Sequence, residues 1–564
     1  MPIPARAKPA GYGTTSQADG NRRPKSAEWD WLRSHPEAAT TVLLGAALLV
    51  RAAAAAGTFL NPDEVLHFSV ANQDSWLAAY HSSFSISHPP LLPLVLHFWR
   101  IFGDSEFVLR LPSVLLGTAF CWVFFRWLSN LFGPTAGWIG LILAGFLPPM
   151  VALSAEVRQY ALLLFFSALA LYWLERALEE NSAAIMLASV FCLYLALLSH
   201  YSAGLFAAAM GIYGALRLLM GPAPFSRSVI TVWAVGQAVG AGLCLFLYLT
   251  SVKALAEFFQ GQPLRAWMGE TYLHNSYYDP ERHHVLLFIA SRTGSVFQYL
   301  FGQDAIGDLA FLGFIVALIL LMWNRSLPAG IHTSQPLLAT LLALPFGLNC
   351  AAALAGHYPY GGTRHCVFLV LFALAAVSFS LSRVAGQRPG RATVLAIVIV
   401  VLCYLFPSRR LPYIARTDQN RAHMLQAVSF LQRQVPSSDV IFVDNQTSLL
   451  LAHYLCRQQV FSVYQSMRTF NSFQCGGHPI IATRGDAFFF TAKNFFPNWN
   501  HMVRAYRIPQ GSQVWVLQEG WLWGDSLARQ LQAKYPNFRD LNPLSFGHNI
   551  TIFKLTVPPN GELL

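Results

Sequence analysis

The sequence predicts a mainly α-helical membrane protein with many spanning helices, followed by a small α/β domain. Of the 564 residues, 54% are hydrophobic and only 12% carry a charge, roughly half the charged fraction of a soluble domain. Apolar runs of about 18 residues or more recur along the chain, which is typical of helices that cross a membrane. After about residue 408 the pattern changes to short apolar strands between polar segments.

The N-terminal arm, residues 1–38, is polar and contains Pro, Gly and Ser. This composition predicts a disordered segment on the cytoplasmic side. The arm lacks the apolar core and the small-residue cleavage site of a secretory signal at the right position. We therefore expect the first apolar helix to remain in the membrane as an uncleaved anchor.

Hydropathy predicts about eleven spanning helices, which form a membrane domain over residues 39–407. The segment 285–300 is apolar but is interrupted by Ser291, Arg292 and Thr293. This favours a helix at the membrane surface, with a twelfth span as the alternative. The expected spans cover 39–60, 106–131, 134–153, 157–176, 182–199, 202–220, 228–253, 305–323, 336–355, 364–383 and 392–407.

Basic residues orient these spans, because cytoplasmic loops are enriched in Lys and Arg. They all fall on one side if the N-terminus is cytoplasmic and the number of spans is odd. We therefore expect a multi-pass plasma membrane protein, which suits a bacterial inner membrane, with its tail outside the cytoplasm. The basic residues are Arg22, Arg23, Lys25, Arg33, Arg217, Arg227, Arg325, Arg383, Arg388 and Arg391.

The tail, residues 408–564, is expected to fold as an extracytoplasmic α/β domain. Apolar or alternating runs at 440–443, 514–517 and 550–555 predict strands, and 448–456 predicts a helix. Elements of both kinds favour a layered α/β fold. Cys456 and Cys475 both lie in this tail, so an extracytoplasmic location permits a disulfide between them. The other six cysteines fall within or beside spans and are expected to pack as small apolar groups.

In a soluble protein, a net charge of +11 would suggest a nucleic-acid partner, but in a membrane protein it does not. No basic patch is interleaved with aromatic residues, so we expect no nucleic-acid partner. Cytoplasmic loops and an anionic phosphate substrate account for the charge better. No Cys/His spacing resembles a zinc site.

An acidic pair, Asp63 and Glu64, follows the first apolar segment and opens a first loop, residues 61–105. A carboxylate near hydrocarbon costs several kcal/mol, so a functional role is the first hypothesis. The alternative is that Asp63 caps a surface helix started by Pro62, with Glu64 solvated in its first turn.

The loops expected outside the cytoplasm collect most of the chemically active side chains. Taken singly, each has a structural explanation: His88 could shape a turn, Arg158 could pair with Glu156, and the tyrosines could belong to an aromatic belt. Their gathering on one side favours a site. The candidate substrate-binding residues are His88, Arg110, Glu156, Arg158, Tyr160, His200, Tyr201, Tyr360, Arg364 and His365.

Such residues could transfer a group from a lipid-linked phosphate. A carboxylate can accept the proton of an incoming hydroxyl, and arginines can hold the phosphate leaving group. Neighbouring residues on a helix diverge by about 100°, so Asp63 and Glu64 cannot both point at one atom. One is expected to face the reaction centre, and the other a metal or a structural partner.

The order of motifs in the first 210 residues resembles the multi-spanning glycosyltransferases of the GT-C class. It is similar to the protein O-mannosyltransferase (family 39) type and its bacterial relatives, which include the lipid A aminoarabinose transferases. The resemblance is weaker over the remaining spans. It is carried by Arg51, Asp63-Glu64, His88-Pro89-Pro90-Leu91, Phe102-Gly103-Asp104-Ser105-Glu106, Arg110-Leu111-Pro112-Ser113, Ser154 to Tyr160 and Ser199-His200-Tyr201.

The resemblance implies a polyprenyl-phosphate sugar donor, an extracytoplasmic active site, and a first-loop aspartate acting as general base with inversion at the sugar carbon. By position, Asp63 would be that base and Glu64 its companion. Arg158 and Arg364 are the candidates for the donor phosphate. Relatives differ in using a divalent metal ion, so the resemblance leaves the metal open.

The C-terminal position of the extra domain departs from the family pattern, in which a lumenal domain is inserted between spans. The acceptor, whether lipid, glycan or protein, therefore stays open. A transporter or flippase for a lipid-linked substrate is one alternative, although inverted repeats and polar broken helices are not evident. Arg51 is the main polar residue inside a span and is expected to extend toward the surface. A non-catalytic envelope assembly protein is the other alternative.

Overall fold

The computed structural model describes residues 36–86, 88–221, 224–253, 273, 275–323, 334–386, 389–408, 420–456, 461–520, 525–559 and 563. Its contacts divide the chain into two units, Met1–Val42 and Leu43–Leu564. Of the first unit, only the beginning of helix α2 (Pro36–Ala55) is described. Nearly all of the expected arm 1–38 therefore lies outside the described residues, as do Arg325 and Arg388.

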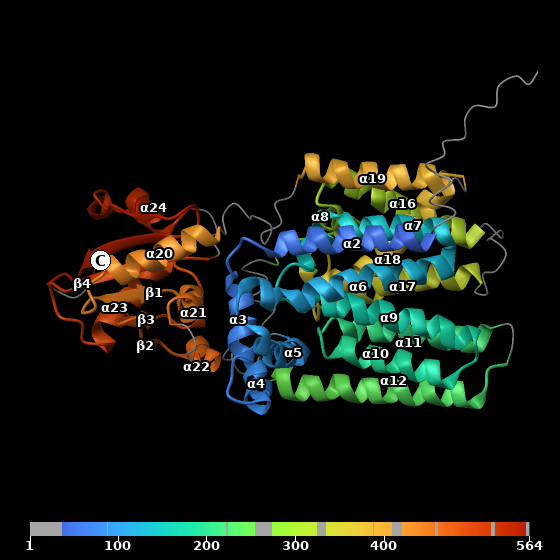
Figure 1. The fold of residues 1–564 in the computed structure, drawn as a ribbon, viewed down its shortest axis with the longest axis horizontal. Coiled ribbons are helices and arrows are strands. Elements are labelled where there is room, and N and C mark those ends of the chain that lie inside the picture. The colour runs from blue at the N-terminus through green and yellow to red at the C-terminus, as the bar shows by residue number, and fades with distance from the viewer. Residues whose placement is uncertain are drawn as a thin grey trace, which may run out of the picture. The chain divides into compact units, whose positions relative to one another are not determined.

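The membrane part is built from apolar helices, several of which run side by side (Figure 1). Short helices form the first loop: α3 (Pro62–Ala71), α4 (Trp76–Ser82), η1 (Ser83–Ser85), α5 (Leu91–Trp99) and η2 (Arg100–Phe102). The helices that follow are α6 (Glu106–Phe132), α7 (Pro134–Phe146), α8 (Pro148–Leu153), α9 (Tyr160–Glu179), α10 (Ala183–Leu197), α11 (Ala203–Met220), α12 (Arg227–Leu247), η3 (Tyr248–Val252), α15 (Val285–Phe301), α16 (Asp304–Trp323), α17 (Gln335–Leu354), η4 (Arg364–Leu369), α18 (Val370–Val384) and α19 (Pro389–Leu405).

Eight helices in the described part of the chain are long and apolar enough to cross a membrane. They coincide with eight of the expected spans. The other three expected spans contain shorter apolar helices, α7, α10 and α19, and α15 at 285–301 is also short. The expected span 134–153 is divided at Leu147, because Pro148 and Pro149 end one helix and start the next. The expected class, a polytopic helical membrane protein with a small C-terminal α/β domain, is confirmed.

Arg51 in α2 is buried instead of extending toward the membrane surface. Its guanidinium donates to the backbone oxygens of Ala144 (2.9 Å) and Gly145 (2.8 Å) near the end of α7. Carbonyl groups at a helix end lack helical partners and carry partial negative charge, so they stabilise a buried cation. The expectation that Arg51 extends outward is therefore wrong.

The C-terminal part contains a six-stranded sheet in the order β2-β3-β1-β4-β6-β5. Strand β1 (Val440–Val443) is parallel to its neighbours β3 (His478–Ala482) and β4 (Gln513–Gln518), and the outer strands pair antiparallel. The expected strands at 440–443, 514–517 and 550–555 are thus confirmed. The remaining elements are α20 (Arg421–Gln434), α21 (Asn445–Tyr454), α22 (Val463–Arg468), β2 (Asn471–Cys475), η5 (Gly485–Ala487), α23 (Ala492–Ala505), α24 (Leu527–Lys534), η6 (Pro536–Phe538), β5 (Leu544–Ser545) and β6 (Thr551–Thr556).

Alternate side chains of the strands enter two separate cores, as the twofold repeat of a strand requires. Ile441 and Val443 pack with residues of α20 and α21 on one face. Phe442 packs with residues of α23 and α24 on the other face. The first of these cores also contains Leu60 and other residues around α3, so the C-terminal domain and the first loop share one hydrophobic core.

One local feature crosslinks the C-terminal domain internally, and another brings it against the first loop. Cys456 and Cys475 form a disulfide, which confirms the pairing that an extracytoplasmic tail permits. Gly520 follows β4 with φ +102°, and a Cβ there would lie 2.7 Å from Cγ of Pro62. A side chain at residue 520 would therefore collide with the first turn of α3.

The expected division into 1–38, 39–407 and 408–564 stays a prediction.

Candidate active site

Helix α3 begins with a capping box that separates the two acids. Asn61 Oδ1 accepts from the backbone N–H of Glu64, and Glu64 Oε2 accepts from the N–H of Asn61. Pro62 occupies the first helical turn, where its missing N–H costs nothing. Asn61 is therefore the cap, and the alternative in which Asp63 caps the helix with Glu64 solvated does not hold.

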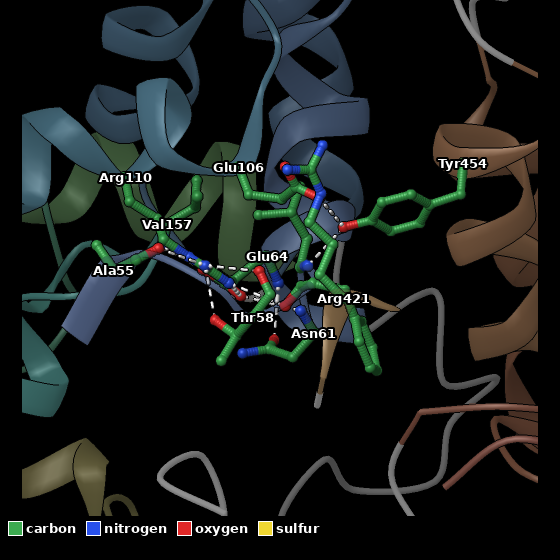
Figure 2. Close-up of polar contacts among 11 residues, drawn as sticks. Ala55, Thr58, Asn61, Glu64, Glu106, Arg110, Val157, Arg421 and Tyr454 are labelled. Atoms are coloured by element: carbon green, nitrogen blue, oxygen red, sulfur yellow. Dashed lines mark hydrogen bonds and ion pairs between the residues drawn. The ribbon is translucent and has the colours of Figure 1, made fainter. Parts of the chain in front are cut away.

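Glu64 is fully buried and fully paired. Its two carboxylate oxygens accept from Nε and Nη2 of Arg110 at 2.7 Å each. Oε1 also accepts from the backbone N–H of Val157 at 2.8 Å. Figure 2 shows Arg110 reaching on to the backbone oxygen of Ala55 and to Thr58. Glu64 thus joins α2, α3, α6 and the segment before α9.

The C-terminal domain contributes to the same network through Tyr454 (Figure 2). The Tyr454 hydroxyl accepts from the backbone N–H of Leu60 at 2.7 Å and donates to Glu106 Oε1 at 3.2 Å. Glu106 Oε1 also forms an ion pair with Arg421, whose Nε lies 3.2 Å away. The segment leading into α3 is therefore held by a side chain from the C-terminal domain.

Asp63 points to a different cluster. Its Oδ2 lies 3.0 Å from Nη1 of Arg158 and 2.7 Å from Nη1 of Arg364, and no hydrogen bond from a described residue reaches Oδ1. The Asp63 side chain is 17% exposed, so it is reachable from outside. Arg158 in turn donates to the Tyr160 hydroxyl at 3.0 Å. Two cations and a carboxylate with one free oxygen therefore meet at one point.

Charge decides the ionisation of Asp63. Burial by itself raises the pKa of a carboxyl group, but the guanidinium groups of Arg158 and Arg364 outweigh burial and hold the pKa of Asp63 well below its usual range. Asp63 is consequently a carboxylate at every physiological pH. In this arrangement its affinity for a proton is low.

A row of imidazole rings lies beside this point. The ring of His67, one turn after Asp63, stacks on His88 at 5.3 Å, and His88 stacks on His200 at 5.5 Å. His365 continues the row at 6.4 Å from His200. Burial, with the charge of Arg158 in addition, lowers the pKa of His67, His88 and His200, that of His200 to about 3. These three rings are neutral.

Polar neighbours orient two of the rings. The Nε2 amide of Gln159 lies 3.0 Å from Nδ1 of His88, and Ser202 Oγ lies 2.8 Å from Nδ1 of His200. Nε2 of His200 and both ring nitrogens of His67 are buried without a partner in the described part of the chain. Buried polar atoms without partners cost free energy, so the fold bears this cost at the histidine row.

Glu156 is the second ionisable acid of the region. Burial first, and the nearby charge of Glu64 second, raise its pKa to about 8, although three arginines oppose the shift. Its Oε1 is buried without a partner among the described residues. Arg158 does not pair with its side chain but donates its backbone N–H to the Glu156 backbone oxygen. Glu156 is therefore mostly protonated at pH 7.

The structure thus sorts the expected site residues into groups. Asp63, Arg158, Tyr160, Arg364 and the histidines 88, 200 and 365 form one cluster, and Glu64 with Arg110 forms the second. Tyr360 lies elsewhere, with its hydroxyl 2.7 Å from Thr293 Oγ1. Tyr201, whose pKa burial raises to about 12, lies beside Ser251 of η3.

Two residues of the cluster, His67 and Gln159, were not among the expected site residues. His67 stands four residues after Asp63, so both lie on one face of α3, and this spacing was the available signal. Gln159 follows Arg158 directly and carried no signal, because a single amide in a loop has no distinguishing pattern. Which arginine pairs with which acid could also not be predicted from the sequence, because it depends on the tertiary fold.

The described residues do not fit a metal ion held by protein side chains alone. Among them, no three His, Cys, Asp or Glu side chains converge in a way that could hold one. The imidazole rings stack face to face at more than 5 Å, whereas ligands converge on a metal at about 2 Å. We derive no catalytic step through a metal.

Comparison with known proteins places this geometry in context. Residues 87–249 match the family model described as dolichyl-phosphate-mannose-protein mannosyltransferase. ArnT from Cupriavidus metallidurans bound to undecaprenyl phosphate is similar over 91% of this chain and 97% of its own, with 11% identity and a TM-score of 0.51. The chain has a GT-C glycosyltransferase fold. The resemblance expected from the sequence is confirmed.

Further GT-C structures are less similar. The archaeal oligosaccharyltransferase AglB from Archaeoglobus fulgidus, in complex with an inhibitory peptide and a dolichol-phosphate, covers 86% of this chain and 70% of its own (10% identity, TM-score 0.48). The arabinosyltransferase EmbB from Mycobacterium smegmatis covers 73% and 34% (15% identity, TM-score 0.36). No curated protein sequence matches the chain.

Proposed function

We propose that this protein transfers a sugar from a polyprenyl-phosphate donor to a hydroxyl of an extracytoplasmic acceptor, with Asp63 as general base. The observation that carries the proposal is the Asp63 carboxylate, which has one oxygen between two arginines and the other without a partner. The GT-C fold supports it, as does the undecaprenyl phosphate bound to ArnT. In this proposal the tail and the Asp63 cluster face away from the cytoplasm, and the N-terminus lies inside.

Arg158 and Arg364 are suited to the donor phosphate. Both guanidinium groups meet at Asp63, and a guanidinium fork matches phosphate oxygens well. When a phosphate binds, the positive charge is shared between phosphate and carboxylate. The pKa of Asp63 then rises toward its ordinary range, which makes Asp63 a better base in the loaded enzyme than in the free one.

The transfer can be written with these groups. The acceptor oxygen attacks the sugar carbon from the face opposite the phosphate, and its proton passes to Asp63 Oδ1. The bond between that carbon and the phosphate oxygen breaks, and polyprenyl phosphate leaves with the electron pair while the arginines stabilise its charge. The configuration at the sugar carbon inverts. The neutral histidine row lines the site beside Asp63 without adding charge.

The test uses the purified protein in lipid vesicles with a panel of radiolabelled polyprenyl-phosphate sugars. Asp63→Asn should lower release or transfer of the sugar by about 10²–10⁴-fold, the usual contribution of a general base. Asp74→Asn, an exposed aspartate of the same loop, is the matched control and should behave as wild type. Near-wild-type turnover by Asp63→Asn would remove Asp63 from the mechanism.

The same experiment separates the alternatives. A flippase would move the labelled donor across the vesicle membrane without breaking its phosphate bond. An assembly protein would do neither. In both cases neither the wild-type protein nor the Asp63→Asn variant would cleave the sugar–phosphate bond.

A further inference from the structure

Two buried acids, Asp444 and Glu519, lie at one edge of the C-terminal sheet. Asp444 directly follows β1, and Glu519 directly follows β4. These strands are parallel neighbours, with Val443 opposite Leu517, so their carboxyl ends meet at the same edge. Asp444 is 0% exposed and Glu519 is 1% exposed. Neither acid belongs to the Asp63 cluster, and the proposed transfer does not use them.

The two acids have unequal hydrogen-bond partners. Oδ1 of Asp444 accepts from the backbone N–H and the hydroxyl of Thr447, and Oδ2 accepts from the N–H of Phe490 at 2.9 Å. The Thr447 hydroxyl also accepts from the backbone N–H of Glu519 at 3.1 Å, which joins the two strand ends. Oε1 of Glu519, by contrast, is buried without a partner among the described residues. Because hydrogen bonds stabilise an ionised carboxylate, Asp444 ionises first and Glu519 keeps its proton.

No cation compensates this pair within the part of the chain that the structure describes. Neither acid forms an ion pair there, and no arginine, lysine or histidine acts on the pKa of Glu519. The charged side chains on the elements around the pair are Asp63 and Glu64 of α3, Arg468 of α22, Arg484 after β3 and Asp525 before α24. The two acids of α3 are already paired with arginines, and the other three side chains are exposed.

Burial and mutual repulsion therefore keep a proton at this edge of the sheet. Burial raises the pKa of Asp444 to about 7, although its hydrogen bonds oppose the shift. Burial first, and the charge of Asp444 second, raise the pKa of Glu519 well above its ordinary range. A second buried negative charge without a cation is costly. At pH 7 the pair consequently carries at least one proton, on Glu519.

The same edge of the sheet lies against the beginning of α3. Gly520 directly follows Glu519, and a Cβ on Gly520 would lie 2.7 Å from Cγ of Pro62. The core that the first loop shares with the C-terminal domain continues from this contact through Leu60 and Leu449. We call this contact and its shared core the docking of the domain on α3. Hydration of Glu519 from this side requires α3 and the sheet edge to separate.

We propose that the proton on Glu519 holds the C-terminal domain docked on α3 at acidic and neutral pH, and that its loss at alkaline pH separates the two. Ionised Glu519 would stand beside the charge of Asp444 in a site without a cation, and hydration relieves this repulsion. The domain is thereby a proton-operated latch on the helix that carries Asp63. The inference goes beyond the proposed function, because docking is measured without any transfer reaction.

The sign of the pH dependence follows from the raised pKa of Glu519. An acid whose pKa is higher in the docked state stabilises docking fully below its ordinary pKa, and this stabilisation is lost as the pH rises toward the docked pKa. Within this window the ratio of docked to separated protein falls about tenfold per pH unit. Glu519→Gln cannot ionise, so its docking should no longer depend on pH in this way.

The test measures docking as a distance between two spin labels in the full-length protein, reconstituted in lipid nanodiscs. The labels are attached to noncanonical ketone amino acids in place of Asp74 and Asp540, which are exposed in the first loop and in the C-terminal domain. This leaves the cysteines untouched. Electron–electron double resonance at pH 5, 7 and 9 should give one narrow distance distribution at pH 5 and an additional longer distance at pH 9.

Three variants sharpen the measurement. Glu519→Gln should keep the narrow distribution at pH 9. Asp444→Asn, which removes the repelling charge and retains a good N-cap residue, should show a smaller shift than wild type. Asp525→Asn, an exposed acid of the same domain, is the matched control and should shift as wild type does. Docking of each variant at pH 5, in the same measurement, verifies that it folds.

Three results would overturn the proposal. A wild-type distance distribution that stays the same from pH 5 to pH 9 would show that no proton controls docking. A full shift in Glu519→Gln would assign the pH dependence to another group. A melting temperature that falls with pH in wild type but not in Glu519→Gln, without any change of distance, would show that the acid stabilises the domain internally. In Glu519→Gln, any fall of transfer activity at alkaline pH reports on the Asp63 cluster alone.

Discussion

Asp63 and Glu64 are neighbours on one helix, yet the structure treats them in opposite ways. Both oxygens of Glu64 are buried and saturated by Arg110, Asn61 and Val157. Asp63 meets two arginines through one oxygen and leaves the other open. Two acids adjacent in sequence can therefore have separate roles, one structural and one chemical. Arginine partners alone do not distinguish them, because both acids have arginine partners.

The strongest test of this contrast is Glu64→Gln. The change leaves the buried Arg110 without its counter-charge, and breaking a buried ion pair costs about 3–5 kcal/mol. We expect a marked drop in the melting temperature of the purified protein. Glu180→Gln, which breaks the half-exposed surface pair with Arg176, should change it little. If Glu64→Gln melts like wild type but transfers no sugar, Glu64 belongs to the chemistry.

A smaller effect is expected at the arginines that face Asp63. Arg158→Lys and Arg364→Lys keep the charge but lose the planar fork, so each should raise the KM for the donor about 10–100-fold, equivalent to about 1.5–3 kcal/mol for a hydrogen bond to a charged group. Thermal stability should change less than in Glu64→Gln. Arg176→Lys is the surface control. An unchanged donor KM in both variants would place the donor phosphate elsewhere.

The pH dependence of kcat/KM separates Asp63 from Glu156. Since the arginines hold the pKa of Asp63 low, Asp63 is ionised across the accessible range and gives no acid limb above pH 5. Glu156 has its pKa raised to about 8, so above pH 8 it adds a negative charge near the anionic donor. We expect activity to fall there, and Glu156→Gln to remove the fall. A rise through pH 8 that Glu156→Gln abolishes would make Glu156 the base.

The smallest expected effect is at Tyr454. Tyr454→Phe removes the acceptor for the buried N–H of Leu60 and the donor to Glu106, which costs about 1 kcal/mol. We expect kcat to fall about fivefold at an unchanged donor KM, because the start of α3 is less firmly held. Tyr506→Phe in the C-terminal domain is the control. A change in donor KM instead of kcat would contradict a positioning role.

The sequence predicts the elements of this fold better than it predicts their pairing. Hydropathy locates the spans because the bilayer fixes their length, and strand patterns locate β1, β4 and β6 because buried runs are short and apolar. The sorting of Arg110 to Glu64 and of Arg364 to Asp63 joins residues 46 and 301 positions apart. Such distances are set by tertiary packing, which leaves no local pattern.

Two errors have similar physical causes. Hydropathy treats Arg51 as a misplaced charge, but the carbonyl groups that end α7 accept hydrogen bonds from its Nη1 and Nη2 inside the membrane part. Hydropathy also predicts one continuous span across Leu147, where two prolines end one helix and start the next without interrupting the apolar character. In both places the backbone, which hydropathy ignores, determines the structure.

The contacts of Tyr454 and Gly520 with the beginning of α3 set an order of events during biosynthesis. A ribosome adds Leu60 long before Tyr454, which stands 394 residues later in the chain. The helix that carries Asp63 is therefore synthesised before the partners that hold its first turn. These contacts are complete only after the C-terminal domain has been synthesised and has folded, so a chain cut short by a premature stop codon before residue 454 lacks them.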